Sequence, residues 1–258
     1  MDFEHITDDI LRLKVPFENI YTAVFLIRGE GGYILVDAAA CERDAKEVIL
    51  PALTKCIDPC EIKYLFCTHL HGDHGGGIRH LLPYLKNAKV AAASARAVEL
   101  YGKENVQTVH DGDMLCGIKA LSLAGHSLDS MGLVDERSST LILGDAVQLY
   151  GITKYGCGVG FPKEYRETLS HIGKMGVQRL VASHEYYPLG ADAEGDNVGA
   201  YIEKAKSAFL HVENFVRENR HIGDAAAIAA SFTAEARKSE PDMPALQSYT
   251  VKALLSER

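Results

Sequence analysis

The sequence lacks both a long basic run and a long apolar run. Its formal net charge is −8, from 35 acidic and 27 basic side chains, so no basic stretch is available for a sequence-independent grip on nucleic-acid phosphates. No apolar run approaches the roughly 18 residues that a membrane-spanning helix needs. We therefore expect neither nucleic acid nor membrane as a partner.

The first residues, MDFEHITDDILRLKV, lack the features of a secretory signal, because acidic side chains replace the basic ones and no apolar core follows. We therefore expect the protein to be cytoplasmic, where reducing conditions favour free thiols. Among the six cysteines, Cys56 and Cys60 form one close pair with no second pair nearby. We interpret that pair as a buried helix end and not as a zinc site.

Apolar residues make up 47% of the 258 residues, which is ample for a packed core in one large domain. The β-rich runs YTAVFLIRG and YILVDAA are separated by Glu30-Gly31-Gly32, which predicts a hairpin. Residues 42–55 predict a helix that Pro51 must bend or end. The segment IKYLFCTH is almost wholly apolar, so we expect a strand buried on both faces.

Candidate polar residues follow several of the predicted strands. Those that stand just beyond a β-run are Asp37, His69, His126, Asp145 and His184. Loops at strand ends are places where a rigid scaffold can gather side chains that are distant in sequence. We therefore predict an α+β fold over residues 1–195, a four-layer αββα sandwich of two sheets covered by helices, with the site along one rim.

Residues 196–258 form a predicted helical extension. Helices are expected over 197–220, 224–238 and 247–257, and in the first of these apolar side chains recur at helical spacing. Three roles remain open for this extension: it can cover the core, form a lid that shapes the substrate pocket, or pair two chains into a homodimer.

The segment CTHLHGDHGGG, residues 67–77, places His69, His71, Asp73 and His74 within six positions. Residues two apart in an extended loop project to the same side, so His69 and His71 can share one ion, while Asp73 and His74 can serve a second. Imidazole and carboxylate without nearby thiolate pairs suit Zn²⁺, Mn²⁺ or Fe²⁺. We expect the three glycines at 75–77 to let the backbone turn tightly into a helix.

Together with four later or earlier elements, this motif resembles the metallo-β-lactamase superfamily over about residues 5–190. The matching elements are Thr68-His69-Leu70-His71-Gly72-Asp73-His74, Gly125-His126-Ser127, Gly144-Asp145, Ser183-His184-Glu185 and the strand-end Asp37. The turn after His126 reads Leu128-Asp129 where the family commonly has Pro-Gly.

The resemblance implies two divalent metal ions, with zinc as the first expectation and iron or manganese as alternatives. It places His69, His71 and His126 on one ion. It places Asp73, His74 and His184 on the other. Asp145 would bridge the two ions, and Asp37 would orient a ligand without binding metal.

Two ions about 3.5 to 4 Å apart can share a water and lower its pKa far enough to supply hydroxide near neutral pH. Asp73 and Asp145 are therefore the candidate catalytic residues, and Asp145 could also relay a proton to the leaving group. The chemistry predicted is hydrolysis of a small-molecule ester, thioester or lactone by attack on its carbonyl.

Residues 155–172 and 183–188 resemble the hydroxyacylglutathione hydrolases in part. The positions that help to hold glutathione in that family are Val159 and Phe161 here, and neither side chain can make those contacts. Related lactonases use a pocket tyrosine to steady the carbonyl oxygen. Tyr150 and Tyr155, which follow Asp145, are therefore the candidate substrate-binding residues.

Other functions stay open at this point. A persulfide dioxygenase of the same superfamily uses one iron held by two histidines and an aspartate. A nucleic-acid phosphodiesterase is disfavoured by the acidic charge. A binding or sensor protein without activity fits poorly, because every expected ligand is present. A flavin-linked diiron reductase would carry a glutamate where this chain has His71.

Overall fold

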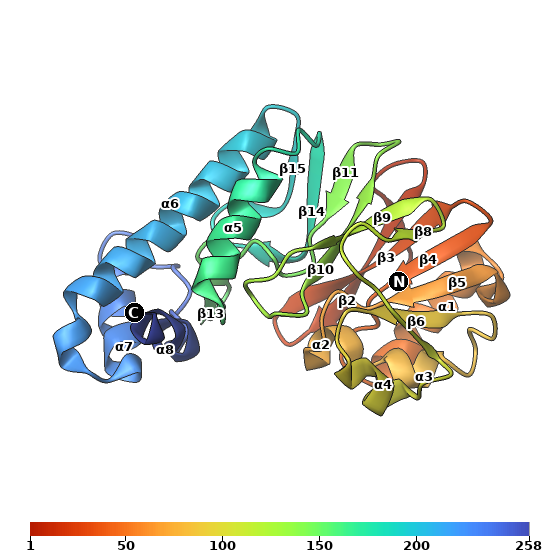
Figure 1. Ribbon diagram of the computed structural model, residues 1–258, viewed down its shortest axis with the longest axis horizontal. Helices are drawn as coiled ribbons and strands as arrows, with labels where there is room; N and C mark the ends of the chain where they lie inside the picture. The colour runs from red at the N-terminus through yellow and green to blue at the C-terminus, as the bar shows by residue number, and fades with distance from the viewer. Residues whose placement is uncertain (258) are drawn as a thin grey trace. The chain divides into compact units, whose positions relative to one another are not determined.

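The computed structural model describes residues 1–257, and the internal contacts divide the chain into two compact units (Figure 1). Unit 1 contains Met1–Ser122 and Asp129–Gly144, and unit 2 contains Leu123–Leu128 together with the chain from Asp145 onward. Within residues 1–257, no helix combines the length and the apolar character that crossing a bilayer requires. The predicted boundary between residues 195 and 196 falls inside unit 2 and stays a prediction.

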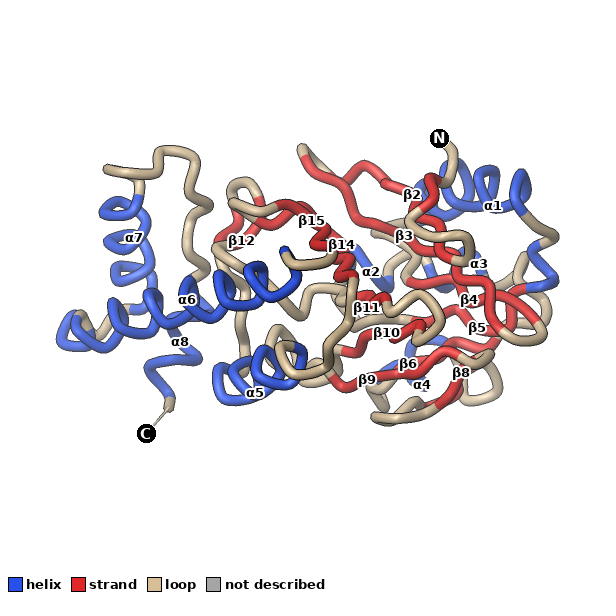
Figure 2. Tube along the Cα trace, turned by 90° about the horizontal axis from the view of Figure 1, so that it is seen from above, coloured by secondary structure: helices blue, strands red, loops and turns tan. Residues whose placement is uncertain are grey.

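A seven-stranded sheet dominates unit 1 (Figure 2). In spatial and chain order its strands are β1 (Glu4–His5), β2 (Ile10–Phe17), β3 (Ile20–Gly29), β4 (Gly32–Val36), β5 (Ile62–Phe66), β6 (Lys89–Ala92) and β7 (Val106–Thr108). β1 to β4 pair antiparallel, whereas β4 to β7 pair parallel. The predicted hairpin is confirmed, because Gly29 of β3 pairs with Gly32 of β4.

Short helices cover one face of this sheet. They are α1 (Leu50–Cys56), α2 (Gly72–Gly75), α3 (Ile78–Leu81) and α4 (Arg96–Tyr101), with a π-helical segment at Asp44–Ile49 and a 3₁₀ turn at Pro59–Glu61. Ile49, Leu53 and Leu81 join Leu26 and Leu35 of the sheet in one buried cluster. Burying each such side chain contributes about 1.5–3 kcal/mol, so this cluster contributes strongly to the stability of unit 1.

The sequence led us to expect that Pro51 bends or ends its helix. In the structure it does neither, and instead it lies where a π-helical segment changes to an α-helix. The chain is π-helical up to Ile49, and α1 begins at Leu50. Pro51 therefore lies in the first turn of an α-helix, where the N–H that it lacks has no intrahelical partner to lose. The helix ends at Cys56, which is exposed, so the expected burial of Cys56 is wrong.

Four further strands of unit 1 form an antiparallel meander: β8 (Met114–Leu115), β9 (Ile118–Ser122), β10 (Met131–Asp135) and β11 (Thr140–Ile142). The turn between β8 and β9 meets the turn between β3 and β4, since Glu30 N donates to Cys116 O at 2.7 Å. β10 and β11 form an antiparallel hairpin, in which Asp135 pairs with Thr140.

Two glycines after the histidine motif are required by close packing and not by a left-handed turn. Gly76 and Gly77 have φ angles of −61° and −79°, which any residue adopts. A Cβ on Gly76 would overlap the carbonyl oxygen of Ala40, and one on Gly77 would overlap that of Ala38. The motif loop is thus held against residues 38–40, which corrects the turn role expected for these glycines.

We expect Gly77→Ala to lower the free energy of unfolding by about 2 kcal/mol, because a backbone carbonyl has little room to move away from the added methyl group. Gly72→Ala is the matched control, since nothing lies within 4 Å of a Cβ at that position. Urea denaturation of both variants measures the difference. Equal losses of stability in the two variants would contradict the packing argument.

Unit 2 combines strands with the helical extension. Its elements are β12 (Gly151–Ile152), β13 (Tyr155–Gly156), α5 (Pro162–Ile172), β14 (Arg179–Tyr186), β15 (Gly190–Glu194), α6 (Asn197–Glu218), a 3₁₀ turn at Arg220–Ile222, α7 (Ala225–Ala236) and α8 (Ser248–Ser256). β14 pairs with β15, and β12 pairs with β13, both antiparallel. The three helices predicted in the extension are confirmed.

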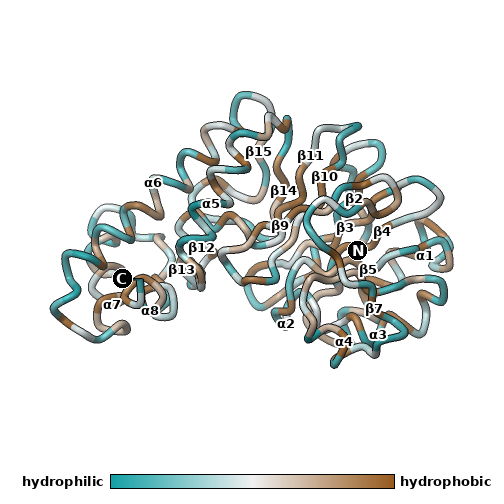
Figure 3. Tube along the Cα trace, viewed as in Figure 1, coloured by the Kyte–Doolittle hydropathy of each residue, from teal (hydrophilic) through white to brown (hydrophobic). Residues whose placement is uncertain are grey.

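One face of α6 is apolar and buried, so hydrophobic and hydrophilic residues alternate along the helix (Figure 3). The ring of Phe209 lies 4.7 Å from that of Tyr165 on α5, and the ring of Phe215 lies 5.3 Å from that of Phe232 on α7. The extension is therefore packed within unit 2. The predicted homodimer remains a prediction.

Candidate metal centre

The ends of parallel strands bring the first candidate residues together in unit 1. β4 ends at Val36 and β5 at Phe66, and Asp37 N donates to Phe66 O at 2.8 Å. Because parallel strands place their carboxyl ends at one edge of a sheet, Asp37 lies beside the start of the histidine motif. Its φ of +62° is a left-handed conformation that aspartate tolerates better than most residues.

The carboxylate of Asp37 is fully buried and binds three donors. Its Oδ1 accepts from Thr68 N at 2.8 Å, and its Oδ2 accepts from Thr68 Oγ1 at 2.8 Å and from His74 Nδ1 at 2.8 Å. The proton of His74 therefore lies on Nδ1, which leaves the lone pair on Nε2. This is the orienting role that the sequence suggested for Asp37.

A second histidine of the motif is oriented through the same hydroxyl group. Since Thr68 Oγ1 donates to Asp37, it accepts from His69 Nδ1, which lies 3.2 Å away. The Nε2 of His69 then faces Nδ1 of His71 at 3.0 Å, and the His69 ring lies 4.2 Å from the ring of His74. Three imidazoles are thus close together in unit 1. Two of them, those of His69 and His74, are oriented by hydrogen bonds at Nδ1.

Asp73 completes the cluster in unit 1. Its Oδ2 lies 3.6 Å from Nε2 of His74, and its side chain is only partly buried. Asp129, which replaces the common Gly of the family's turn, accepts from Leu70 N at 3.2 Å. This departure from the family pattern therefore fixes the backbone between His69 and His71.

Three further candidates lie together in unit 2. Asp145 Oδ2 is 3.8 Å from His126 Nε2, and Asp145 Oδ1 is 3.5 Å from His184 Nε2. All three residues are buried, with exposed fractions of 8% or less. The carboxylate therefore presents one oxygen to each of two imidazoles.

The sequence analysis placed His184 just beyond its strand, but in the structure His184 lies inside β14. The register between β14 and β15 shifts between Val181 and Tyr186, so regular pairing is interrupted around this histidine. Such an irregularity can re-aim a side chain that a regular strand would direct elsewhere. This shift has no local sequence signal, which explains the error.

The turn that carries His126 is held by the segment after β13. His126 Nδ1 donates to Gly158 O at 2.5 Å, so its lone pair lies on Nε2, the nitrogen nearest Asp145. A Cβ on Gly125 would overlap the backbone of Tyr165 at the start of α5, and its φ is +145°. Glycine is therefore needed before this histidine.

Gln148 is a neighbour of the site that the sequence reasoning missed. Its Nε2 donates to Asp145 O at 2.7 Å and to Tyr186 Oη at 3.1 Å, while its Oε1 accepts from Gly158 N at 3.2 Å. One buried amide thus connects the backbone of Asp145 with the peptide that orients His126. A single glutamine in a loop has no pattern that would have identified it.

The two candidate substrate tyrosines lie in the loop and hairpin after Asp145. The ring of Tyr150 faces the extension, with its centroid 6.4 Å from that of His211 and 5.6 Å from Lys204 Nζ, both on α6. Tyr155 lies in β13 and forms a bridge with Ala245. Their role in binding substrate stays a prediction.

Two thiols lie next to the candidate ligands. Cys67 Sγ donates to His69 O at 3.0 Å, and Cys157 precedes the glycine that binds His126. Both are buried, and burial raises the pKa of each thiol well above its usual range. The structure of residues 1–257 has all six cysteines unpaired, and their reduced state in the cell stays a prediction.

The donors of each unit suit a metal of borderline hardness. Unit 1 supplies three imidazoles and a carboxylate, and unit 2 supplies two imidazoles and a carboxylate. His69, His74 and His126 each have Nδ1 hydrogen-bonded and Nε2 left as a lone-pair donor, which is the tautomer that zinc-type ligands use. The free thiols lie outside this set, as harder or borderline ions prefer.

Comparison with known proteins is consistent with this donor set. A model of the metallo-beta-lactamase superfamily matches residues 19–184. A hydroxyacylglutathione hydrolase of Rhodopseudomonas palustris is 30% identical over 200 residues, which cover 68% of this chain and 72% of that protein. An atrochrysone carboxyl ACP thioesterase of Aspergillus fumigatus is 26% identical over 175 residues, covering 64% of this chain. The chain spans only 51% of the length of that thioesterase.

A solved structure shares the fold. The rubredoxin oxygen:oxidoreductase of Desulfovibrio gigas superposes with a TM-score of 0.66 over 99% of this chain and 75% of that chain, at 15% identity. This degree of sequence identity supports a common fold and nothing about activity. The predicted αββα sandwich is confirmed.

Proposed function

Because the chain belongs to the metallo-β-lactamase superfamily, we propose that it is a binuclear metal-dependent hydrolase that acts on the carbonyl group of a small ester, thioester or lactone. The observation that carries this proposal is the carboxylate of Asp145, whose oxygens lie 3.8 Å from His126 Nε2 and 3.5 Å from His184 Nε2. A carboxylate placed in this way can give one oxygen to each of two cations.

The proposed ligands follow the family pattern. One ion is assigned to His69, His71 and His126, the other to Asp73, His74 and His184, and Asp145 is the bridge. Zinc is the proposed metal, because imidazole and carboxylate donors suit it and its geometry is flexible. The tautomers fixed by Asp37, Thr68 and Gly158 support this assignment.

When bound, the pair of ions would supply a hydroxide near neutral pH and polarise the substrate carbonyl. The protein's own contribution is orientation. Asp37 keeps the proton of His74 on Nδ1, and Gly158 O does the same for His126. Asp145, enclosed between two imidazoles, is the carboxylate placed to accept a proton and return it to the leaving atom.

Thioesters are the substrate class that the named relatives favour, since one is named a carboxyl ACP thioesterase and another a hydroxyacylglutathione hydrolase. Glutathione itself is disfavoured. Val159 is fully buried, and its amide N donates to Thr250 Oγ1 at 2.9 Å, while Phe161 offers no hydroxyl group. These positions therefore cannot supply the charged and polar contacts that a glutathione tail needs.

Metal quantification on the purified protein, followed by a screen of thioesters, lactones and phosphodiesters, tests the proposal. We expect two metal ions per chain and turnover of carbonyl substrates alone. One iron per chain with oxygen uptake would replace the proposal by a mononuclear dioxygenase. Protein that binds no metal, or that hydrolyses phosphodiesters alone, would overturn it.

A further inference from the structure

A tyrosine of the last helix lies against the peptide that orients His126. Tyr249 belongs to the first turn of α8, and a Cβ on Gly158 would overlap its hydroxyl oxygen. The carbonyl oxygen of the same Gly158 accepts the hydrogen bond from His126 Nδ1. Gly158 therefore lies between the Tyr249 hydroxyl and the candidate ligand His126 and contacts both. In the chain, 91 positions separate Tyr249 from Gly158.

The first turn of α8 is fastened to this segment by the next residue. Thr250 Oγ1 donates to Cys157 O at 2.6 Å and accepts from Val159 N at 2.9 Å. The Thr250 side chain is fully buried. These two hydrogen bonds flank Gly158 on both sides, so the position of Tyr249 over that glycine is fixed by the backbone of residues 157–159.

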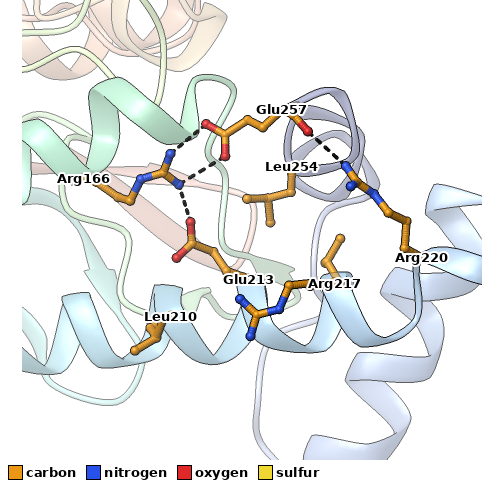
Figure 4. A pocket seen from close by; sticks show the side chains of 8 residues that line it. Arg166, Leu210, Glu213, Arg217, Arg220, Leu254 and Glu257 are labelled. Carbon is orange, nitrogen blue, oxygen red and sulfur yellow. Dashed lines mark hydrogen bonds and ion pairs between the residues drawn. The ribbon is translucent and has the colours of Figure 1, made fainter.

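The far end of α8 is held by an arginine cluster (Figure 4). Arg166 of α5 pairs with Glu257 at 2.8 Å and also with Glu213 of α6. Arg220 donates to Leu255 O at 2.9 Å and to Glu257 O at 3.0 Å. Exposed ion pairs of this kind are individually weak, but together they restrict α8 at the end opposite Tyr249.

The hydroxyl group of Tyr249 is available as a donor. The residue is 40% exposed, and no protein group within residues 1–257 forms a hydrogen bond with its hydroxyl. Burial of the hydroxyl end raises the pKa of Tyr249, and the negative charge of Asp145 acts in the same direction. The phenol thus remains protonated at neutral pH, so its hydroxyl can donate a hydrogen bond.

We propose that Tyr249 is a substrate-positioning residue, whose hydroxyl donates a hydrogen bond to an oxygen of the bound acyl substrate. The inference rests on the proposed function. It assigns the last helix of the extension to the substrate site, which is one of the three roles left open by the sequence. A phenylalanine would keep the aromatic ring on α8 and remove only the hydroxyl that faces Gly158, so this substitution isolates the role of the hydroxyl.

Tyr249→Phe separates the two roles. We expect kcat/KM for the best carbonyl substrate to fall about tenfold, mainly through a higher KM, because the lost hydrogen bond serves binding. Metal content and melting temperature should stay at the values of the unaltered protein. Tyr84→Phe is the matched control, since Tyr84 is 41% exposed and lies in unit 1.

Each other outcome overturns a different statement. Unaltered protein that is active, with Tyr249→Phe unchanged in KM and kcat, would overturn this inference and leave the proposed function standing. A fall in metal content in Tyr249→Phe would show a structural role in supporting His126 and would also overturn it. Unaltered protein that binds metal and hydrolyses no carbonyl substrate would overturn the proposed function and this inference with it.

Discussion

Replacing Asp145 with alanine should lower turnover of the best carbonyl substrate by about a thousandfold or more. The side chain lies between His126 and His184, and alanine has no carboxylate to offer either cation. Its removal would also reduce the metal content per chain, because the proposed bridge contributes to both ions. Steady-state kinetics and elemental analysis of the same preparation measure the two effects.

Asp8→Ala provides the control for Asp145→Ala, because Asp8 is an exposed carboxylate in the turn between β1 and β2. It should retain full metal content and turnover. Asp145→Ala protein that kept both ions and undiminished turnover would exclude the bridging role.

Asp37→Asn should weaken metal binding about 10- to 100-fold. Asparagine has nearly the same shape and tolerates the φ of +62°, so the loop is expected to keep its path. However, an amide nitrogen would replace the carboxylate oxygen that faces either His74 Nδ1 or Thr68. One donor then meets another donor, and the proton on His74 is no longer held on Nδ1.

Competition with a chromophoric chelator measures the change in affinity for Asp37→Asn. Asp135→Asn is the matched control, because Asp135 is equally buried in unit 1 but binds Arg137 and Ser138 away from the histidine motif. The control should lose stability without losing metal affinity. Equal metal affinities for Asp37→Asn and the unaltered protein would show that Asp37 does not orient a ligand.

The features predicted well from the sequence are those with a local periodic or motif signal. β-rich and apolar runs located the hairpin of β3 and β4 and the strand β5, and helical spacing located α6. The motif at residues 68–74 located the cluster of unit 1, because its ligands are neighbours in the chain. The matches at His126 and Asp145 depended on the resemblance to a family and not on any local period.

The features missed depend on contacts between distant segments. Gln148 and Tyr249 reach the peptide at Gly158 from a loop and from the last helix, and neither segment carries a pattern that specifies its partner. His184 was misplaced relative to its strand because a register shift is a property of two paired strands. The sequence analysis expected Gly77 to allow a tight turn. The structure shows that glycine is needed there because a Cβ would overlap the carbonyl oxygen of Ala38.

The distribution of thiols has a practical consequence for spectroscopy. Alkylating reagents attack thiolates that solvent can reach, so the buried Cys67 and Cys157, whose pKa values are raised, should resist maleimides. The exposed Cys41 is the thiol that such a reagent meets first, whereas the pKa of exposed Cys56 is raised by partial burial and by Asp2. A fluorophore or nitroxide can therefore be coupled to the native chain at Cys41, without engineering away the sulfur atoms beside the histidines.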